Sequence, residues 1–344
     1  GLAMTRLIAG FDAGQTHTTC RLMRQVEDGR WLRVADGRGP GVSHLAAPQG
    51  AERLITALQQ SLAAASGSLG TGRPPLVAAA IGASGIETGS TIQQLGRELA
   101  AKALGLAVER VVVSGDERTA LRGAFPSGAG ILMISGTGCI AVGRNGAGEE
   151  HRCGGWGWLL DGSGSAMDIG RDGLMATLRM ADGRDPDTPL RDTLWRAMEV
   201  STPEQLKAAV VQADFGAAGF ARLAPWVDQL AEQGDQQALA IIERSAAGLG
   251  DLVAGVAQAL QLTTPAVAPV GGAISHLQSL RLAWQRELNR RLPGASVVPP
   301  HQDACHGALM MALDRLNPAA GDDTDRSEMD RSEAAHTFCP QQPD

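Results

Sequence analysis

The sequence has little that points to a metal cluster, a disulfide scaffold or a nucleic-acid partner. Its five cysteines are scattered and form no Cys-X-X-Cys pair, which argues against a disulfide framework, a zinc ribbon and an iron–sulfur cluster held within one chain. The net charge is −7 and no basic stripe stands out, so nucleic acid is not expected as a partner. No apolar run reaches the length of about 18 residues that a membrane span needs, and the first residues lack a secretory-signal pattern. We therefore expect a cytoplasmic protein with no membrane partner.

The length and the order of predicted elements indicate two related domains. A chain of 344 residues favours two domains, and 44% hydrophobic with 19% charged residues is an ordinary globular balance. A β-rich start followed by alternating helices and strands begins near residue 7 and again near residue 131, which predicts an α/β fold built by approximate duplication. The predicted divisions are a first domain at 4–116, a second at 117–302, a last helix at 303–316 and a disordered tail at 317–344.

A glycine-rich turn follows the first buried strand, predicted at residues 7–11. Glycine allows close approach of the backbone to a ligand, turn amides can point at an anion, and a carboxylate suits Mg²⁺. An ordinary hairpin turn is the alternative interpretation. We favour a phosphate-binding turn in which Asp12 holds Mg²⁺, mostly through water. The candidate residues are Asp12, Gly14, Gln15, Thr16 and Thr18.

Two further glycine-rich turns lie in the second half. Gly136, Thr137 and Gly138 follow the apolar run 131–134 and suit close approach to a β- or γ-phosphate, although hairpins contain similar turns. Gly271 and Gly272 end a later strand, where small residues would let adenine and ribose lie against the backbone. A simple strand-to-helix turn is the alternative there. Phosphate turns in both halves suggest a nucleotide clamped between two domains.

Two other motifs carry candidate chemistry. Asp116 follows a predicted strand at 110–113, and ligands gather at strand ends in α/β folds, but aspartate is also a frequent helix N-cap. Gly155 and Trp156 belong to a Gly-Gly-Trp-Gly stretch that permits close backbone approach, and an indole can pack on a sugar face. The alternative for that stretch is a loop anchored by a core tryptophan.

These motifs, together with the ending Asp303–Met310, occur in an order that resembles the actin-like ATPase superfamily of sugar kinases, Hsp70 and actin. Within it, the chain resembles the N-acetylglucosamine and glucosamine kinase branch, which groups with the BadF/BadG/BcrA/BcrD-type ATPases. The resemblance covers about residues 5–316. It implies two actin-like (ribonuclease H-like) domains with ATP and a small-molecule sugar in the cleft between them, Mg²⁺, domain closure and often a homodimer.

The resemblance also implies a role for each motif. Asp116 would be the catalytic base that accepts the proton of the sugar hydroxyl and orients its oxygen toward the γ-phosphate. The turns at Asp12, Gly136 and Gly271 would bind nucleotide. Thr137, Gly138, Gly155 and Trp156 would lie at the sugar, and the helix 303–316 would return to the first domain.

The chain departs from the family pattern at two positions. The family's sugar-contacting Asn falls at Ser43, which has shorter reach and fewer donors, and the neighbouring His44 could substitute for it. The family's sugar-contacting Asp falls at Gly162, with Asp161 one residue earlier, so that a small bend would be needed for Asp161 to serve. Both departures bear on which sugar is bound.

The sequence thus predicts an ATP-dependent carbohydrate kinase that phosphorylates a hydroxyl of N-acetylglucosamine, glucosamine or a related hexose. One alternative is an ATPase activator of a dehydratase or reductase, against which the cysteine pattern counts. The other is a non-catalytic sugar sensor on a kinase scaffold, against which the presence of Asp12 and Asp116 counts.

Overall fold

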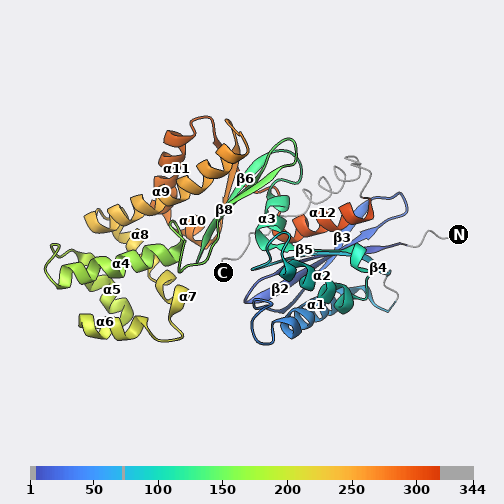
Figure 1. Cartoon of the computed structure of the whole chain (residues 1–344), viewed down its shortest axis with the longest axis horizontal. Coiled ribbons are helices and arrows are strands. Elements are labelled where there is room, and N and C mark those ends of the chain that lie inside the picture. Colours follow the sequence, from blue (N-terminus) through green and yellow to red (C-terminus); the bar gives the residue numbers. More distant parts are fainter. Residues whose placement is uncertain (1–4, 72–73, 318–344) are drawn as a thin grey trace. The chain divides into compact units, whose positions relative to one another are not determined.

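Two five-stranded sheets with one shared strand order form the framework of the computed structural model, which describes residues 5–71 and 74–317. The first sheet has the order β3-β2-β1-β4-β5 and the second the order β10-β9-β6-β7-β8 (Figure 1). The strands are β1 (Leu7–Ala13), β2 (His17–Gln25), β3 (Trp31–Pro40), β4 (Leu76–Ala83), β5 (Val111–Gly115), β6 (Gly130–Ser135), β7 (Cys139–Arg144), β8 (Glu150–Gly154), β9 (Ala266–Val270) and β10 (Ser296–Val297).

The pairing within the sheets confirms the predicted duplication. In each sheet, the first three strands along the chain pair antiparallel, and the two later strands are added in parallel. Each strand of the first sheet therefore has a counterpart in the second sheet, from β1 with β6 to β5 with β10. The predicted α/β fold with two related halves is confirmed.

The structure divides into two compact units, residues 5–127 with 300–317, and residues 128–299. The boundary lies after Ser127, later than the predicted domain boundary after Asp116. The reason is that helix α3 (Asp116–Ala124) packs against α12 (Ala304–Leu316) and β4, which belong to the first unit. The predicted tail at 317–344 lies outside the described residues apart from Asn317.

The first sheet is covered on both faces, as its alternating side chains require. Ala9 and Phe11 of β1 join the apolar cluster on the side of α1 (Gly50–Ser66) and α2 (Thr91–Leu104). Ile8, which directly precedes Ala9 and so lies on the other face of the strand, joins the cluster formed with α12. Helix α12, the last helix of the described residues, therefore completes the core of the first unit, as the resemblance implies.

The second unit is mostly helical and has one apolar cluster. The helices are α4 (Ala166–Ala181), α5 (Pro189–Met198), α6 (Pro203–Val210), α7 (Gly216–Ala221), α8 (Ala224–Glu232), α9 (Gln236–Ala259), α10 (Gly272–His276) and α11 (Gln278–Arg291), with short 3₁₀ turns at Gly67–Leu69 and Val108–Arg110 in the first unit. Helices α4, α8 and α11 pack against α9, and α5 and α7 pack against α4. Helices α7 and α8 are separate, since Pro225 cannot continue α7. In the first unit, β3 extends to Pro40, which pairs with His17.

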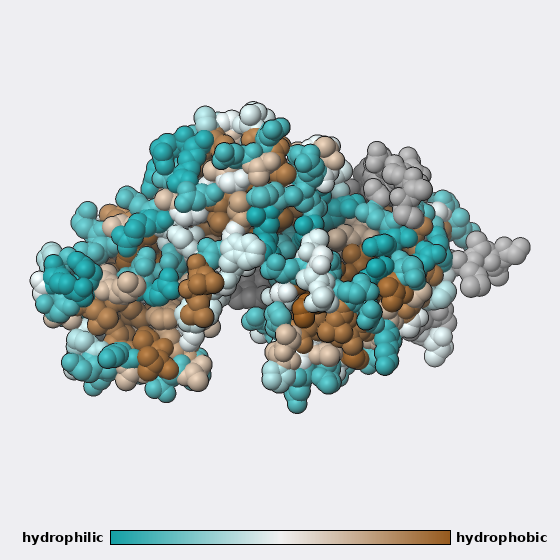
Figure 2. All heavy atoms as spheres, viewed as in Figure 1, coloured by the Kyte–Doolittle hydropathy of each residue, from teal (hydrophilic) through white to brown (hydrophobic). Residues whose placement is uncertain are grey.

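Hydrophobic side chains on the visible face of each unit gather in a few patches on a largely hydrophilic surface (Figure 2). Among the described helices, none is long and apolar enough to cross a membrane.

Candidate active site

The candidate residues of the first unit meet at one edge of its sheet. Strands β1, β4 and β5 run parallel, and the register aligns Ala13 with Ala83 and Ala83 with Gly115. The carboxyl ends of three strands therefore lie side by side, the place where α/β folds bind ligands. Asp12 is the residue before the last of β1, and Asp116 directly follows the last residue of β5.

The turn after β1 is held by backbone hydrogen bonds. The Gly14 N–H donates to the His17 carbonyl at 3.1 Å, and the Val42 N–H donates to the Gly14 carbonyl at 2.8 Å. A Cβ on Gly41 would overlap the backbone of Gln15, so only glycine permits this approach. The predicted phosphate turn and the segment that contains Ser43 are therefore neighbours.

Two hydroxyl groups in this region are buried without a partner. Within the described residues, Thr18 Oγ1 and Ser43 Oγ have no hydrogen bond. A buried hydroxyl without a partner costs free energy, and such groups in native structures require an explanation. Both belong to the candidate residues, and a polar ligand that reached them would satisfy them.

Asp116 is exposed and is the first residue of α3, whereas Gly115 is the N-cap. No side chain caps this helix, so the alternative of Asp116 as the N-cap is wrong. The helix is fixed nearby, because the Thr119 hydroxyl donates to the Asp116 carbonyl at 3.1 Å. The carboxylate of Asp116 therefore stands at the sheet edge on an anchored backbone.

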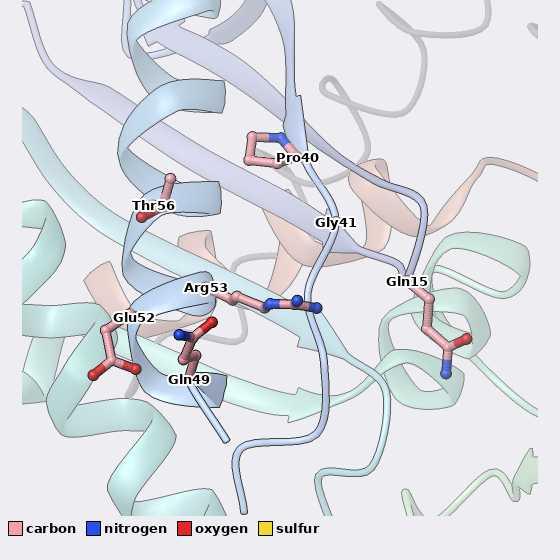
Figure 3. A pocket seen from close by; sticks show the side chains of 7 residues that line it. All are labelled: Gln15, Pro40, Gly41, Gln49, Glu52, Arg53 and Thr56. Atoms are coloured by element: carbon pink, nitrogen blue, oxygen red, sulfur yellow. The ribbon is translucent and has the colours of Figure 1, made fainter. Parts of the chain in front are cut away.

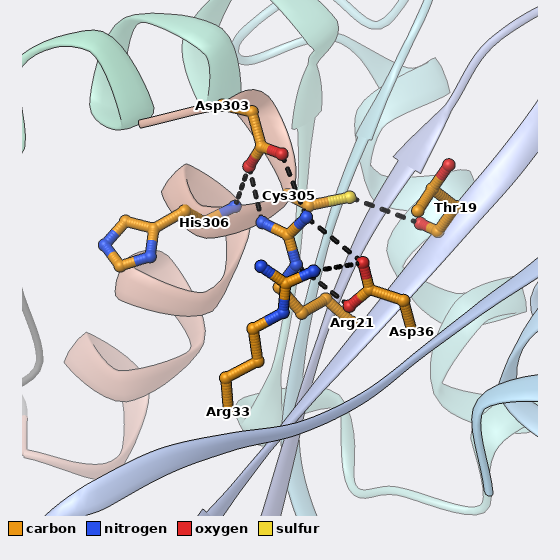
Figure 4. Close-up of polar contacts among 7 residues, drawn as sticks. All are labelled: Thr19, Arg21, Arg33, Asp36, Asp303, Cys305 and His306. Carbon is orange, nitrogen blue, oxygen red and sulfur yellow. Dashed lines mark hydrogen bonds and ion pairs between the residues drawn. The ribbon is translucent and has the colours of Figure 1, made fainter. Parts of the chain in front are cut away.

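Helix α3 is held in place by a close crossing with α12. A Cβ on Gly307 would overlap the Thr119 carbonyl oxygen, and one on Gly123 would overlap the Asp303 carbonyl oxygen. Asp303 caps α12 by accepting from the His306 N–H at 2.9 Å (Figure 4). The position of Asp116 thus depends on α12.

In the second unit, the turn after β6 meets the turn after β9 at the carboxyl edge of its own sheet. The Gly136 N–H donates to the Gly138 carbonyl at 2.8 Å, and the Ala166 N–H donates to the Gly136 carbonyl at 2.8 Å. Gly271 has φ +110°, and a Cβ there would overlap the Ser135 carbonyl oxygen. The turns at Gly136–Gly138 and Gly271–Gly272 and the beginning of α4 are therefore adjacent, as a nucleotide site formed by both turns would require.

The loop between β8 and α4 is exposed and glycine-rich. The Trp156 side chain is not a core anchor, because Trp156 is 59% exposed and the Arg152 guanidinium lies 4.4 Å from its ring centroid. The Trp156 N–H donates to Asp161 Oδ2 at 3.4 Å, so Asp161 faces the glycine-tryptophan segment. Gly162 has φ +115°, a conformation that disfavours aspartate, which accounts for the displacement of the carboxylate to position 161.

Asp168 is a buried carboxylate that the sequence analysis missed. It accepts from the Gly164 N–H and from the Ser245 hydroxyl, both at 3.3 Å, and so ties the glycine-rich loop to α9. Burial, reinforced by the charge of Asp172, raises the pKa of Asp168. The local sequence around Asp168 indicates a helix N-terminus, because Ser165 is the N-cap of α4 and its hydroxyl accepts from the Asp168 N–H.

The donors present fit a metal that arrives with a nucleotide rather than a resident cluster. No group of three or more His, Cys, Asp or Glu side chains among the described residues could hold a metal ion. Asp12 offers one carboxylate beside turn amides, which fits Mg²⁺ bound chiefly by phosphate and water. Burial raises the pKa of Cys20, Cys139 and Cys305, so these thiols are poor cluster ligands.

Comparison with known proteins agrees with this framework. The chain is 27% identical over 266 residues to an N-acetylmuramic acid/N-acetylglucosamine kinase of Clostridium acetobutylicum, across 76% of this chain and 85% of that protein. It is 31% identical over 188 residues to an N-acetyl-D-glucosamine kinase of Dictyostelium discoideum, across 54% of this chain and 59% of that protein. A crystal structure from Chromobacterium violaceum, described as a proposed N-acetylglucosamine kinase, has a TM-score of 0.68 and 28% identity over 89% of this chain and 99% of that one.

The resemblance stated from the motifs is therefore confirmed. The BadF/BadG/BcrA/BcrD ATPase family matches residues 9–312, which include nearly all strands and helices of both units. The chain belongs to the BadF/BadG/BcrA/BcrD ATPase family.

Proposed function

We propose that the protein is an ATP-dependent kinase that phosphorylates a hydroxyl of an amino sugar, N-acetylglucosamine or glucosamine, or of a related hexose. The family and the kinase relatives support an ATP-dependent carbohydrate kinase. The observation that carries the proposal is the register of the first sheet. It aligns Asp12 with Gly82 and Gly82 with Ser114, so that Asp12 near the end of β1 and Asp116 just after β5 stand at one edge of the sheet, with β4 between their strands.

In this proposal, Asp116 is the general base. Its carboxylate accepts the proton of the attacking sugar hydroxyl and orients the oxygen toward the γ-phosphate. Asp116 is exposed, so a substrate hydroxyl can reach it, and its backbone is fixed by Thr119. Much of the rate then comes from positioning of the reactants.

The glycine-rich turns bind the nucleotide in this proposal. The Gly14 and Gly136 N–H groups hold their own turns closed by bonding to the His17 and Gly138 carbonyls. The amides of Gln15, Thr16 and Thr137, with the buried Thr18 hydroxyl, hold phosphate oxygens. Gly271 and Gly272 accommodate adenine and ribose. Asp12 holds the Mg²⁺ that accompanies ATP, mostly through water, and the ion supplies neutralisation of phosphate charge.

The sugar contacts come from both halves of the chain. Ser43 offers a buried hydroxyl that has no partner within the described residues. Asp161 accepts from the backbone of Trp156 and keeps a second carboxylate oxygen for sugar hydroxyls. Trp156 offers an exposed indole for stacking on a sugar face, and Thr137, Gly138 and Gly155 complete the candidate set.

The test is sugar-dependent ADP release with MgATP. The sugars are N-acetylglucosamine, glucosamine, glucose and N-acetylmannosamine, with a reaction lacking sugar as the blank. We expect turnover with an amino sugar well above the blank, and formation of the sugar phosphate confirmed by mass spectrometry. Sugar-independent hydrolysis would favour an ATPase activator, and sugar binding without turnover would favour a sensor.

A further inference from the structure

A short segment, residues 42–45, crosses the carboxyl edge of the first sheet. The chain leaves β3 at Gly41, which lies beside Gln15 of the turn after β1 (Figure 3). The Val42 N–H then donates to the Gly14 carbonyl of the same turn at 2.8 Å. The segment therefore starts at the candidate phosphate turn and is fixed to it by the backbone.

The rest of the segment passes β4 and reaches β5. The His44 ring lies against Gly85, two residues after the end of β4, since a Cβ on Gly85 would lie 2.7 Å from His44 Cδ2 and 3.3 Å from Nε2. The side chains of Leu45 and of Val113 in β5 lie 3.2 and 3.3 Å from the place of a Cβ on Gly96 in α2. Because β4 lies between β1 and β5, the segment meets the three strands in their order in the sheet. His44 therefore lies at the end of the middle strand.

The imidazole of His44 is held in one orientation and one tautomer. Its Nδ1 accepts a hydrogen bond from the Ala46 N–H at 3.1 Å, and the His44 carbonyl accepts from the Ala47 N–H at 2.9 Å. A ring nitrogen that accepts a hydrogen bond carries no proton, so the neutral ring has its proton on Nε2. His44 is exposed, and its Nε2 has no hydrogen bond or ion pair within residues 5–71 and 74–317. The ring therefore presents one N–H donor at the sheet edge.

We infer that His44 is a substrate-contacting residue, whose Nε2–H donates to an oxygen of the bound sugar. The inference rests on the proposed function, since it concerns the sugar whose hydroxyl Asp116 deprotonates. The phosphate turn follows β1 and Asp116 follows β5, so a hydroxyl that reacts between them belongs over the end of β4, where His44 lies. A single neutral N–H suits a hydroxyl or carbonyl oxygen. The preceding residue, Ser43, offers its buried hydroxyl to the same substrate.

Two substitutions separate a sugar contact from a role in the local turn. In His44→Asn, the side-chain oxygen can still accept from the Ala46 N–H, as in an Asx turn, but no donor remains at the Nε2 position. In His44→Gln, the longer side chain brings an amide N–H close to that position. We expect kcat/KM for N-acetylglucosamine to fall about tenfold in His44→Asn, mainly through the KM for the sugar, and less than about threefold in His44→Gln. The KM for ATP should stay unchanged in both variants.

Calorimetry of sugar binding without ATP gives a measurement that does not depend on turnover. The affinity of His44→Asn for N-acetylglucosamine should fall by the same factor as kcat/KM, and that of His44→Gln should stay within about threefold. Glucosamine tells the two oxygen types apart. An equal loss with both sugars identifies a hydroxyl oxygen as the acceptor, and a loss confined to N-acetylglucosamine identifies the acetyl oxygen.

His301→Asn is the matched control, because His301 is exposed and its N–H bonds to the Ala124 carbonyl, at the opposite end of α3 from Asp116. It should leave both sugars unaffected. A larger loss in His44→Gln than in His44→Asn, an effect on the KM for ATP alone, or unchanged sugar affinity in His44→Asn would overturn the inference. Absence of turnover with every sugar would refute the proposed kinase function, whereas the calorimetric comparison would still test the contact of His44.

Discussion

Arg21 of β2 donates hydrogen bonds of 2.6 and 2.9 Å to the two carboxylate oxygens of Asp303, the N-cap of α12 (Figure 4). Asp36 of β3 accepts a third from the Arg21 Nε at 3.0 Å. The Arg21 side chain is only 5% exposed. The pair joins an early strand to the last described helix, which in turn packs against the helix that begins with Asp116.

Breaking this pair should destabilise the first unit strongly. In Arg21→Met, the partly buried Asp303 carboxylate loses its cation while Asp36 keeps Arg33, and we expect the free energy of unfolding in urea to fall by about 3 kcal/mol. The control is Arg30→Met, which removes an ion pair of 2.7 Å whose side chains are about half exposed. That change should cost less than about 1 kcal/mol, and similar losses in the two variants would contradict the role given to the buried pair.

The same pair predicts a pH dependence of stability. Burial alone would raise the pKa of Asp303, but the hydrogen bonds and charge of Arg21 and the His306 N–H outweigh it and hold that pKa below its ordinary value. A lowered carboxyl pKa stabilises the fold above the unfolded-state pKa, about 3.9, and the effect is lost as pH falls through the folded-state pKa. Urea unfolding at pH 7, 5, 4 and 3 should show the gap between the unaltered protein and Arg21→Met narrowing with acid. A gap that stays constant or widens would argue against this assignment.

The crossing of α3 and α12 should tolerate no side chain at Gly307. In Gly307→Ala the new Cβ meets the Thr119 carbonyl, and we expect a loss of about 2 kcal/mol in unfolding free energy together with a lower kcat, since α3 must move. Gly67→Ala is the control, because a Cβ there meets nothing within 4 Å and the backbone is helical, φ −56°. The control should be unchanged or up to about 1 kcal/mol more stable, and an equally stable Gly307→Ala would contradict the tight crossing.

The fold was predictable because its signals are local and repeated. Buried runs such as 7–11 and 131–134 and the glycine turns after them indicated the succession of strands along the chain in both halves. The order of the strands within each sheet was not predicted. The points at which helices end were harder to predict from the sequence, although Pro225 explains the break between α7 and α8. The network of Arg21 with Asp303 and the link of Asp168 to Ser245 could not be predicted, because each joins residues far apart in sequence and carries no local pattern.

The exposed loop before α4 gives a test of the sugar contacts. In Asp161→Asn, the carboxylate that faces the Trp156 backbone loses its charge, and we expect KM for the sugar to rise about tenfold while KM for ATP stays unchanged. Trp156→Ala should raise the sugar KM as well, since stacking is lost. The control is Asp182→Asn, an exposed carboxylate at the end of α4 that pairs only with neighbouring Arg184 in the described contacts. A rise in the KM for ATP alone would indicate that Asp161 and Trp156 contact the nucleotide and not the sugar.

The proposed kinase reaction depends on Asp116 as the group that accepts the proton of the sugar hydroxyl. The most direct measurement is kcat for sugar-dependent ADP release by Asp116→Asn, beside Asp192→Asn, an exposed carboxylate on α5. We predict a loss of at least about a hundredfold in Asp116→Asn with ATP and sugar binding retained, and unchanged kcat in the control. Retention of more than about a tenth of kcat in Asp116→Asn would contradict the account.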